Sequence, residues 1–194
     1  MKSAVLFLVF TFLATGAFGS IDLNSIQTVD IAIGDVNSKL KDANRSNFLM
    51  SVYINGTAAE NRVATYKISP GALTDKFKEG REPELTPEGV FSPTRLEEKW
   101  SSKQHSGGIP GIFDLGAMPY SIFFFNGFAI HGSRSTVDGK PASKGCVRLK
   151  NRDAKKLFTW VQAAITNNKK LGKKAVKIYI QDTEADYVRV FRRK

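Results

Sequence analysis

Cys146 is the only cysteine in this chain of 194 residues, so no disulfide within the chain can hold the fold together. The fold must therefore rest on a hydrophobic core, and a chain of this length can bury a large one. Hydrophobic residues make up 42% and charged residues 24% of the sequence, which is typical of a globular domain. One cysteine and two histidines are too few for a structural zinc site, which usually has four ligands. We expect no metal and no other cofactor.

The first 19 residues have the pattern of a cleaved signal peptide. Lys2 precedes an apolar run over residues 4–13, and small residues follow, with Ala17 and Gly19 at the positions that a signal peptidase reads. The alternative is a membrane anchor, but a spanning helix needs about 20 apolar residues and this run is shorter. We therefore expect cleavage after Gly19 and an exported protein with no stable membrane anchor.

The remaining chain is expected to form one domain with a short N-terminal segment. Residues 20–46 form that segment, and apolar residues spaced by three and four between positions 22 and 42 predict that it is partly helical. Residues 47–194 form the main domain.

Most of the main domain has the pattern of short strands. Asn55-Gly56 and Asn126-Gly127 are turn dipeptides of the kind that favours hairpins. Phe123 to Phe125 are expected to lie in the core on both faces of a strand. One amphipathic helix is predicted over residues 151–168, with Asn151 as its cap. The predicted strands cover residues 48–54, 62–68, 120–125, 128–131, 175–180 and 187–191, and the predicted loops 70–90 and 101–119. The fold class is mainly β with one major helix.

Residues 130–149 contain a candidate catalytic site. His131 is expected at the end of a strand, and a loop rich in Gly, Ser and Pro returns the chain to Cys146. The charges of Lys144 and Arg148, together with the N-terminus of the helix that follows, favour the nucleophilic thiolate. His131 is the candidate base, and the amides around Gly145 and Cys146 are candidate oxyanion donors. A buried, inert cysteine is the alternative, and this cationic loop favours the reactive one.

These motifs resemble a known family. His131-Gly132, a loop of about a dozen residues, and the Ser-x-Gly-Cys-x-Arg block at 143–148 are similar to the signature of the YkuD-type L,D-transpeptidases of the bacterial cell envelope. Upstream, Ser69-Pro70-Gly71 resembles the family's Ser-x-Gly segment, and residues 86–91 resemble its Thr-Pro-x-Gly-x-Phe. The resemblance extends from about Phe48 to the helix at 151–168.

The resemblance implies a mixed β-sandwich-like catalytic domain that acts on peptidoglycan stem peptides in the periplasm or cell envelope of a bacterium. The cysteine would attack the third residue of a tetrapeptide stem, usually meso-diaminopimelate, and release the terminal D-Ala. An acceptor amine would then take the acyl group to form a 3–3 cross-link. With water as the acceptor, the same enzyme is an L,D-carboxypeptidase. By matching position, the implied residues are Cys146 as nucleophile, His131 as base, Ser143 and Gly145 around the loop and oxyanion site, Arg148 supporting the loop or a substrate carboxylate, and Gly132 and Lys144 as secondary positions.

The chain departs from the family at Lys144, where a histidine often stands. We expect His131 to keep the role of base and Lys144 to add positive charge beside the thiol. The remaining histidine, His105, lies in the loop at 101–119 and is expected to be exposed.

A nucleic-acid-binding protein and a wall-binding module are the alternatives from other classes of function. The net charge of +11 suggests an anionic partner, but no nucleic-acid-binding motif is present, and the acidic envelope polymer is the simpler partner. A wall-binding module without activity is the main alternative to an enzyme. The sequence does not specify the oligomeric state.

Overall fold

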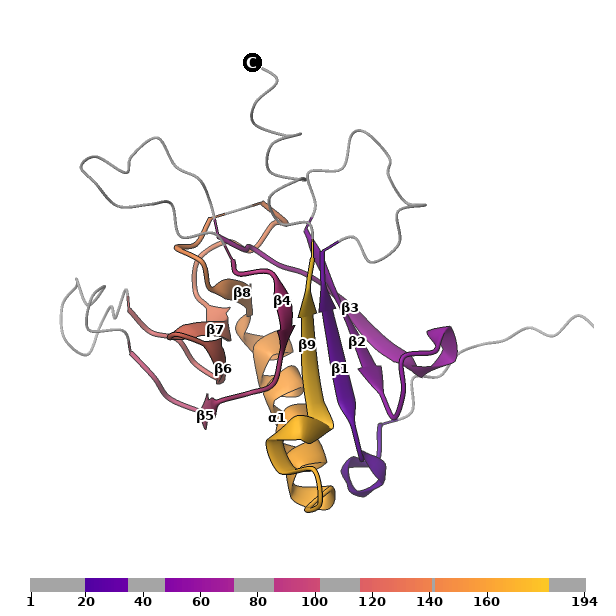
Figure 1. Ribbon diagram of the computed structural model, residues 1–194. Coiled ribbons are helices and arrows are strands. Elements are labelled where there is room, and N and C mark those ends of the chain that lie inside the picture. Colours follow the sequence, from indigo (N-terminus) through magenta and orange to yellow (C-terminus); the bar gives the residue numbers. More distant parts are fainter. Residues whose placement is uncertain (1–19, 35–47, 72–85, 102–115, 141, 182–194) are drawn as a thin grey trace, which may run out of the picture.

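The computed structural model describes residues 20–34, 48–71, 86–101, 116–140 and 142–181. These residues form two mixed β-sheets and one long helix, α1 (Figure 1). The observed architecture confirms the prediction of a mainly-β fold with one major helix. In this part of the chain, no helix is long and apolar enough to cross a membrane.

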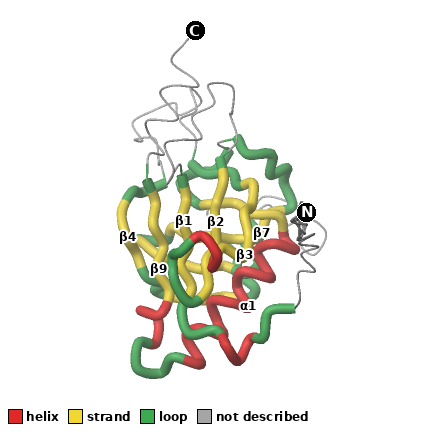
Figure 2. The backbone as a smooth tube through the Cα atoms, turned by 90° about the vertical axis from the view of Figure 1, so that its right-hand side faces the viewer, coloured by secondary structure: helices red, strands yellow, loops and turns green. Residues whose placement is uncertain are grey.

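The larger sheet has five strands in the order β3-β2-β1-β9-β4. Its central strand β1 pairs with β9 in parallel and with β2 antiparallel, and the other pairs are antiparallel. Figure 2 shows these strands running side by side. The strands are β1 (Val29–Ile33), β2 (Leu49–Ile54), β3 (Arg62–Lys67), β4 (Gly89–Phe91) and β9 (Val176–Ile180).

The prediction of a partly helical segment at 22–42 is wrong for most of its described part. Only one short 3-10 helix forms, η1 (Leu23–Ser25), and strand β1 follows it. Val29, Ile31 and Ile33 alternate along β1 and are fully buried, as the period of two of a strand requires. Ala32 is also apolar, which hid this alternation in the sequence. Residues 35–42 lie outside the described part.

The smaller sheet has four strands in the order β5-β6-β7-β8. β7 and β8 are parallel, and the other pairs are antiparallel. The predicted turn at Asn126-Gly127 is confirmed, because both residues have positive φ (38° and 87°). Phe123 and Phe124 are buried as expected, but Phe125 is 40% exposed, so the core prediction is wrong for that residue. The strands are β5 (Arg95–Glu97), β6 (Ser121–Phe125), β7 (Phe128–Ser133) and β8 (Val147–Lys150).

Helix α1 (Asn151–Asn167) contacts strands of both sheets, and its buried side chains belong to the same hydrophobic core as theirs. The predicted helix is therefore confirmed, but its predicted cap is not. Lys150 is the capping residue and makes no side-chain cap hydrogen bond, while Asn151 is the first helical residue. Two more 3-10 helices complete the fold, η3 (Ala59–Asn61) and η4 (Gly172–Ala175).

Several sequence-based predictions concern residues outside the described part. They are the signal peptide at 1–19, most of the loops at 70–90 and 101–119, His105, and the strand at 187–191.

Candidate active site

The register of the smaller sheet places Cys146 and His131 on the same face. Ile130 pairs with Val147 between the parallel strands β7 and β8. Cys146, the residue before Val147, packs against the cluster that contains Ala129, the residue before Ile130. His131 pairs with Arg148 one step further along. Because neighbours across a sheet share a face, Cys146, immediately before β8, is a diagonal neighbour of His131 on β7. Ile130 and Val147 lie between them in sequence and point to the opposite face, into the core.

His131 is held as a neutral imidazole. Its side chain is buried, and the distance from its Nδ1 to the carbonyl oxygen of Gly132 is 2.8 Å. A carbonyl can only accept a hydrogen bond, so Nδ1 carries the proton and Nε2 keeps its lone pair. Burial is the main reason that the pKa of His131 falls to about 4, and the nearby charge of Arg148 lowers it further against the effect of the Gly132 bond. The imidazole is therefore neutral at pH 7.

The loop before Cys146 is tied together by Ser143. The hydroxyl of Ser143 donates to the carbonyl of Cys146 and accepts a 3.2 Å hydrogen bond from the amide of Gly145. Gly145 has a φ of 101°, in the left-handed region that favours glycine. The amide of Gly145, which the sequence suggested as an oxyanion donor, is thus engaged within the loop.

The segment Ser69-Pro70 anchors the same loop from outside. The amides of Ala142 and Ser143 both donate to the carbonyl of Pro70, each at 3.0 Å. The backbones of Ser69 and Arg148 exchange two hydrogen bonds of 3.0 and 2.9 Å, which extend the smaller sheet past β8. The Cys146 loop is therefore held from both sides by backbone bonds.

The two upstream motifs meet beside this loop. The amide of Gly71 donates a 2.9 Å hydrogen bond to Oγ1 of the buried Thr86, and Gly71 forms a β-bridge with Ser143. The sequence signalled both motifs through their resemblance to the family but gave no sign of this contact. It connects three segments far apart in the chain into one support for Cys146.

Arg148 also supports the loop. Its Nη1 donates a 2.9 Å hydrogen bond to the carbonyl of Ala142. Burial lowers the pKa of Arg148, and a negative charge on Cys146 opposes that shift. Of the two roles that the resemblance implied for Arg148, support of the loop is the one with a contact in the structure. Lys144 is exposed.

Gly132 fills a position with no room for a side chain. A Cβ atom there would lie 2.5 Å from Oδ1 of Asn151 and 3.2 Å from the carbonyl oxygen of Pro119, which already accepts the Gly132 amide at 2.8 Å. Strand β7 can therefore approach the first turn of α1 closely beside His131.

One sequence-based detail of the site is wrong. His131 lies within β7, which continues to Ser133, and not at the end of the strand. The helix predicted to follow Cys146 begins at Asn151 as expected, and the short strand β8 occupies the residues between them. Among the described residues, no group of three His, Cys, Asp or Glu side chains could hold a metal ion.

The family model of the L,D-transpeptidase catalytic domain, YkuD, matches residues 39–180. The chain belongs to this family. No curated protein sequence matches it significantly. Among solved structures, it is similar to an L,D-transpeptidase from Xylanimonas cellulosilytica, at 21% identity and a TM-score of 0.50, over 81% of this chain and 62% of that one. It is also similar to the L,D-transpeptidase LdtMt1 in complex with imipenem, at 17% identity and a TM-score of 0.50, over 79% of this chain and 59% of that one.

The chain thus spans about three-fifths of the length of these two structures. At such identities the likeness concerns the fold, and it confirms the YkuD-like architecture that the sequence predicted.

Proposed function

We propose that this protein is an exported L,D-transpeptidase that joins peptidoglycan stem peptides by 3–3 cross-links through a thioester on Cys146. The observation that supports this most strongly is the placement of Cys146 diagonally to His131, whose bond to the Gly132 carbonyl leaves Nε2 free to accept a proton. A thiol beside a neutral imidazole is sufficient for acyl transfer.

In the proposed acylation, Nε2 of His131 takes the proton of the Cys146 thiol, and the sulfur attacks the carbonyl of the third stem residue. The C–N bond to D-Ala breaks, and the imidazolium returns the proton to the leaving amine. The Arg148 charge favours the thiolate during attack and disfavours a long-lived imidazolium. The His131 imidazolium therefore gives its proton to the leaving amine instead of keeping it.

In the proposed deacylation, an acceptor amine from a second stem attacks the thioester. It loses a proton to His131, and the sulfur leaves and recovers a proton from the imidazolium. The net reaction exchanges one amide bond for another. Ser143, Gly145 and Arg148 hold the loop around the sulfur during both steps.

The export of the protein is part of the proposal, because peptidoglycan lies outside the cytoplasmic membrane. Its support is the signal-peptide pattern of residues 1–19. Sequencing the N-terminus of the protein recovered from the cell envelope tests this point. The expected first residue is Ser20.

The activity is tested by incubating the purified protein with tetrapeptide muropeptides and reading the products by mass spectrometry, with Cys146→Ala as the control. Cross-linked dimers that have lost one D-Ala are expected. Tripeptides alone would make the enzyme an L,D-carboxypeptidase on the same site. Unchanged substrate that nevertheless binds to the protein would make it a wall-binding module.

A further inference from the structure

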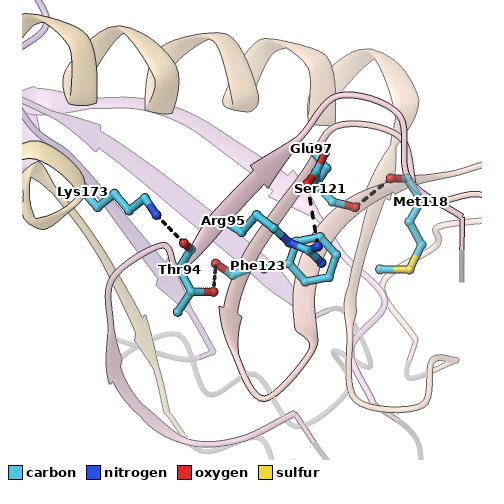
Figure 3. A network of polar contacts seen from close by, with 7 residues as sticks. All are labelled: Thr94, Arg95, Glu97, Met118, Ser121, Phe123 and Lys173. Atoms are coloured by element: carbon cyan, nitrogen blue, oxygen red, sulfur yellow. Dashed lines mark hydrogen bonds and ion pairs between the residues drawn. The ribbon is translucent and has the colours of Figure 1, made fainter.

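A cation held over two aromatic rings lies on the same face of the smaller sheet as Cys146. The guanidinium carbon of Arg95 is 4.1 Å from the ring centroid of Phe123 and 4.3 Å from that of Trp100. The two rings meet edge to face, 5.6 Å apart. Figure 3 shows Arg95 lying across the ring of Phe123. We call these three residues the Arg95 platform.

Backbone pairing fixes the platform. Arg95 and Phe123 are direct partners in the antiparallel pair of β5 and β6. Beyond β5, the chain stays beside the segment that precedes β6, because the amide of Met118 donates a 2.7 Å hydrogen bond to the carbonyl of Trp100. Arg95 and Phe123 are therefore positioned by the pairing of two strands, and Trp100 by a backbone hydrogen bond in the segment that follows β5.

The platform adjoins the wall of the candidate active site. Phe123 pairs with Ala129 of β7, and these two residues form a buried cluster with Met118, against which Cys146 packs. One row of cross-strand neighbours thus leads from Arg95 through Phe123 and Ala129 to Cys146. With strands about 4.8 Å apart, a group lying over β6 is on the order of 10 Å from a residue at the start of β8.

Nothing described within the fold neutralises Arg95 strongly. Its ion pair is with Glu97, at 3.7 Å, and both side chains are more than a third exposed. Such surface pairs contribute little. Trp100 is also 37% exposed. The guanidinium is held in one orientation by the rings while remaining accessible, which suits the two-point recognition of a carboxylate.

We propose that the Arg95 platform binds a carboxylate of the peptide substrate while Cys146 attacks. The inference rests on the proposed function, because peptidoglycan stems carry carboxylates on several residues. An extended peptide rises about 3.4 Å per residue, so the bound carboxylate lies about three residues' length from the attacked carbonyl. Arg95 is a binding and specificity residue, and it takes no part in the proton transfers.

The test compares the unmodified tetrapeptide stem with stems in which one carboxylate at a time is replaced by a carboxamide. For the wild-type enzyme, one of these replacements is expected to raise KM about tenfold with little change in kcat. Arg95→Gln should raise KM for the unmodified stem by a similar factor, so that the unmodified stem and that carboxamide stem have the same KM. Arg95→Lys keeps the charge without the planar fork, and its KM for the unmodified stem should lie between those of the wild type and Arg95→Gln.

Arg62→Gln is the matched control, since Arg62 is an exposed arginine on β3 of the other sheet. It should leave both KM values unchanged. An Arg95→Gln enzyme that still distinguishes the same carboxamide stem as well as the wild type does would overturn the inference and leave the proposed function intact. Thermal melts of each variant show whether it is folded.

A second measurement separates this inference from the proposed function. Trp160, the other tryptophan, is only 3% exposed, so a change in tryptophan fluorescence on adding the stem to Cys146→Ala protein reports mainly on Trp100. Binding that depends on both Arg95 and one carboxylate supports the platform even if the wild type shows no turnover. Binding that is insensitive to every carboxamide, as expected for a sugar stacked on Trp100, would refute it.

Discussion

His131 and Arg148 lie directly opposite each other in the parallel pair of β7 and β8. A buried imidazole beside a guanidinium is costly to protonate, both because it is removed from water and because the two positive charges repel each other. The same guanidinium interacts favourably with a negative charge on Cys146. One arginine thus disfavours a positive charge on His131 and favours a negative charge on Cys146, which is the charge distribution that the proposed attack on a carbonyl requires.

Burial of neutral His131 predicts an acid-sensitive stability. The pKa is about 4 in the folded protein and about 6.5 in the unfolded chain, so only the unfolded state binds the proton between these values. The free energy of unfolding should fall as the pH drops from about 6.5 to about 4. Since one pKa unit corresponds to about 1.4 kcal/mol, this contribution amounts to at most about 3 kcal/mol.

Urea unfolding of the wild type and of His131→Gln at pH 7, 5.5 and 4.5 measures this contribution. Titration of the carboxylates is common to both proteins and cancels in the comparison. The wild type should lose stability relative to the variant on acidification. Parallel curves for the two proteins would show that His131 is not protected from protonation.

Substitution of His131 and substitution of Lys144 should have unequal effects on activity. His131→Ala removes the proposed base and should lower kcat/KM by at least about a hundredfold, the usual contribution of general base catalysis. Lys144→Ala removes only an exposed charge and should cost less than about tenfold. Initial rates of D-Ala release measure both effects. Wild-type activity in His131→Ala would remove the assignment of the base.

The sequence predicts correctly the elements that depend on neighbouring residues, and it misses those that depend on contacts between distant segments. The Asn126-Gly127 turn and the helix over α1 were predicted correctly because both depend on local preferences. β1 was predicted as partly helical because its partners, β2 and β9, are distant in the chain and its burial comes from that pairing. Propensity alone cannot report such a tertiary effect.

The candidate site shows the same division. Residues 131 and 143–148 are predicted as site residues because their residue types and spacing are recognisable within one short stretch of sequence. The hydrogen bond from Gly71 to Thr86 and the alignment of Arg95 with Cys146 could not be predicted. The alignment follows from the registers of three successive strand pairs, and a shift of one residue in any of them would move Arg95 to the other face.

The contact between the two upstream motifs should contribute to stability. Thr86→Val leaves the Gly71 amide without the hydroxyl that accepts its hydrogen bond, and an unsatisfied buried amide costs about 1–3 kcal/mol. The free energy of unfolding should fall by that amount in urea. Thr86→Ser, which keeps the hydroxyl, should lose much less. Equal losses in both variants would show that the stability does not come specifically from the Thr86 hydroxyl.

Gly132→Ala should strain the approach of β7 to α1. The added Cβ would lie 2.5 Å from the side-chain oxygen of Asn151, and such overpacking costs about 1–3 kcal/mol. Thermal and urea unfolding measure the loss. The double variant Gly132→Ala/Asn151→Ala should recover part of it, because Asn151 contributes the closest contact. No recovery would place the strain at Pro119 instead.

Cys146→Ala separates a catalytic cysteine from a structural one. The side chain is only partly buried and packs against the small cluster of Met118, Phe123 and Ala129, so its removal should cost about 1 kcal/mol or less. Turnover of tetrapeptide stems should be abolished, as measured by D-Ala release. Urea unfolding gives the stability of the same preparation. A loss of several kcal/mol would instead indicate that Cys146 is a core residue, because the cost of a cavity scales with how completely the side chain is enclosed.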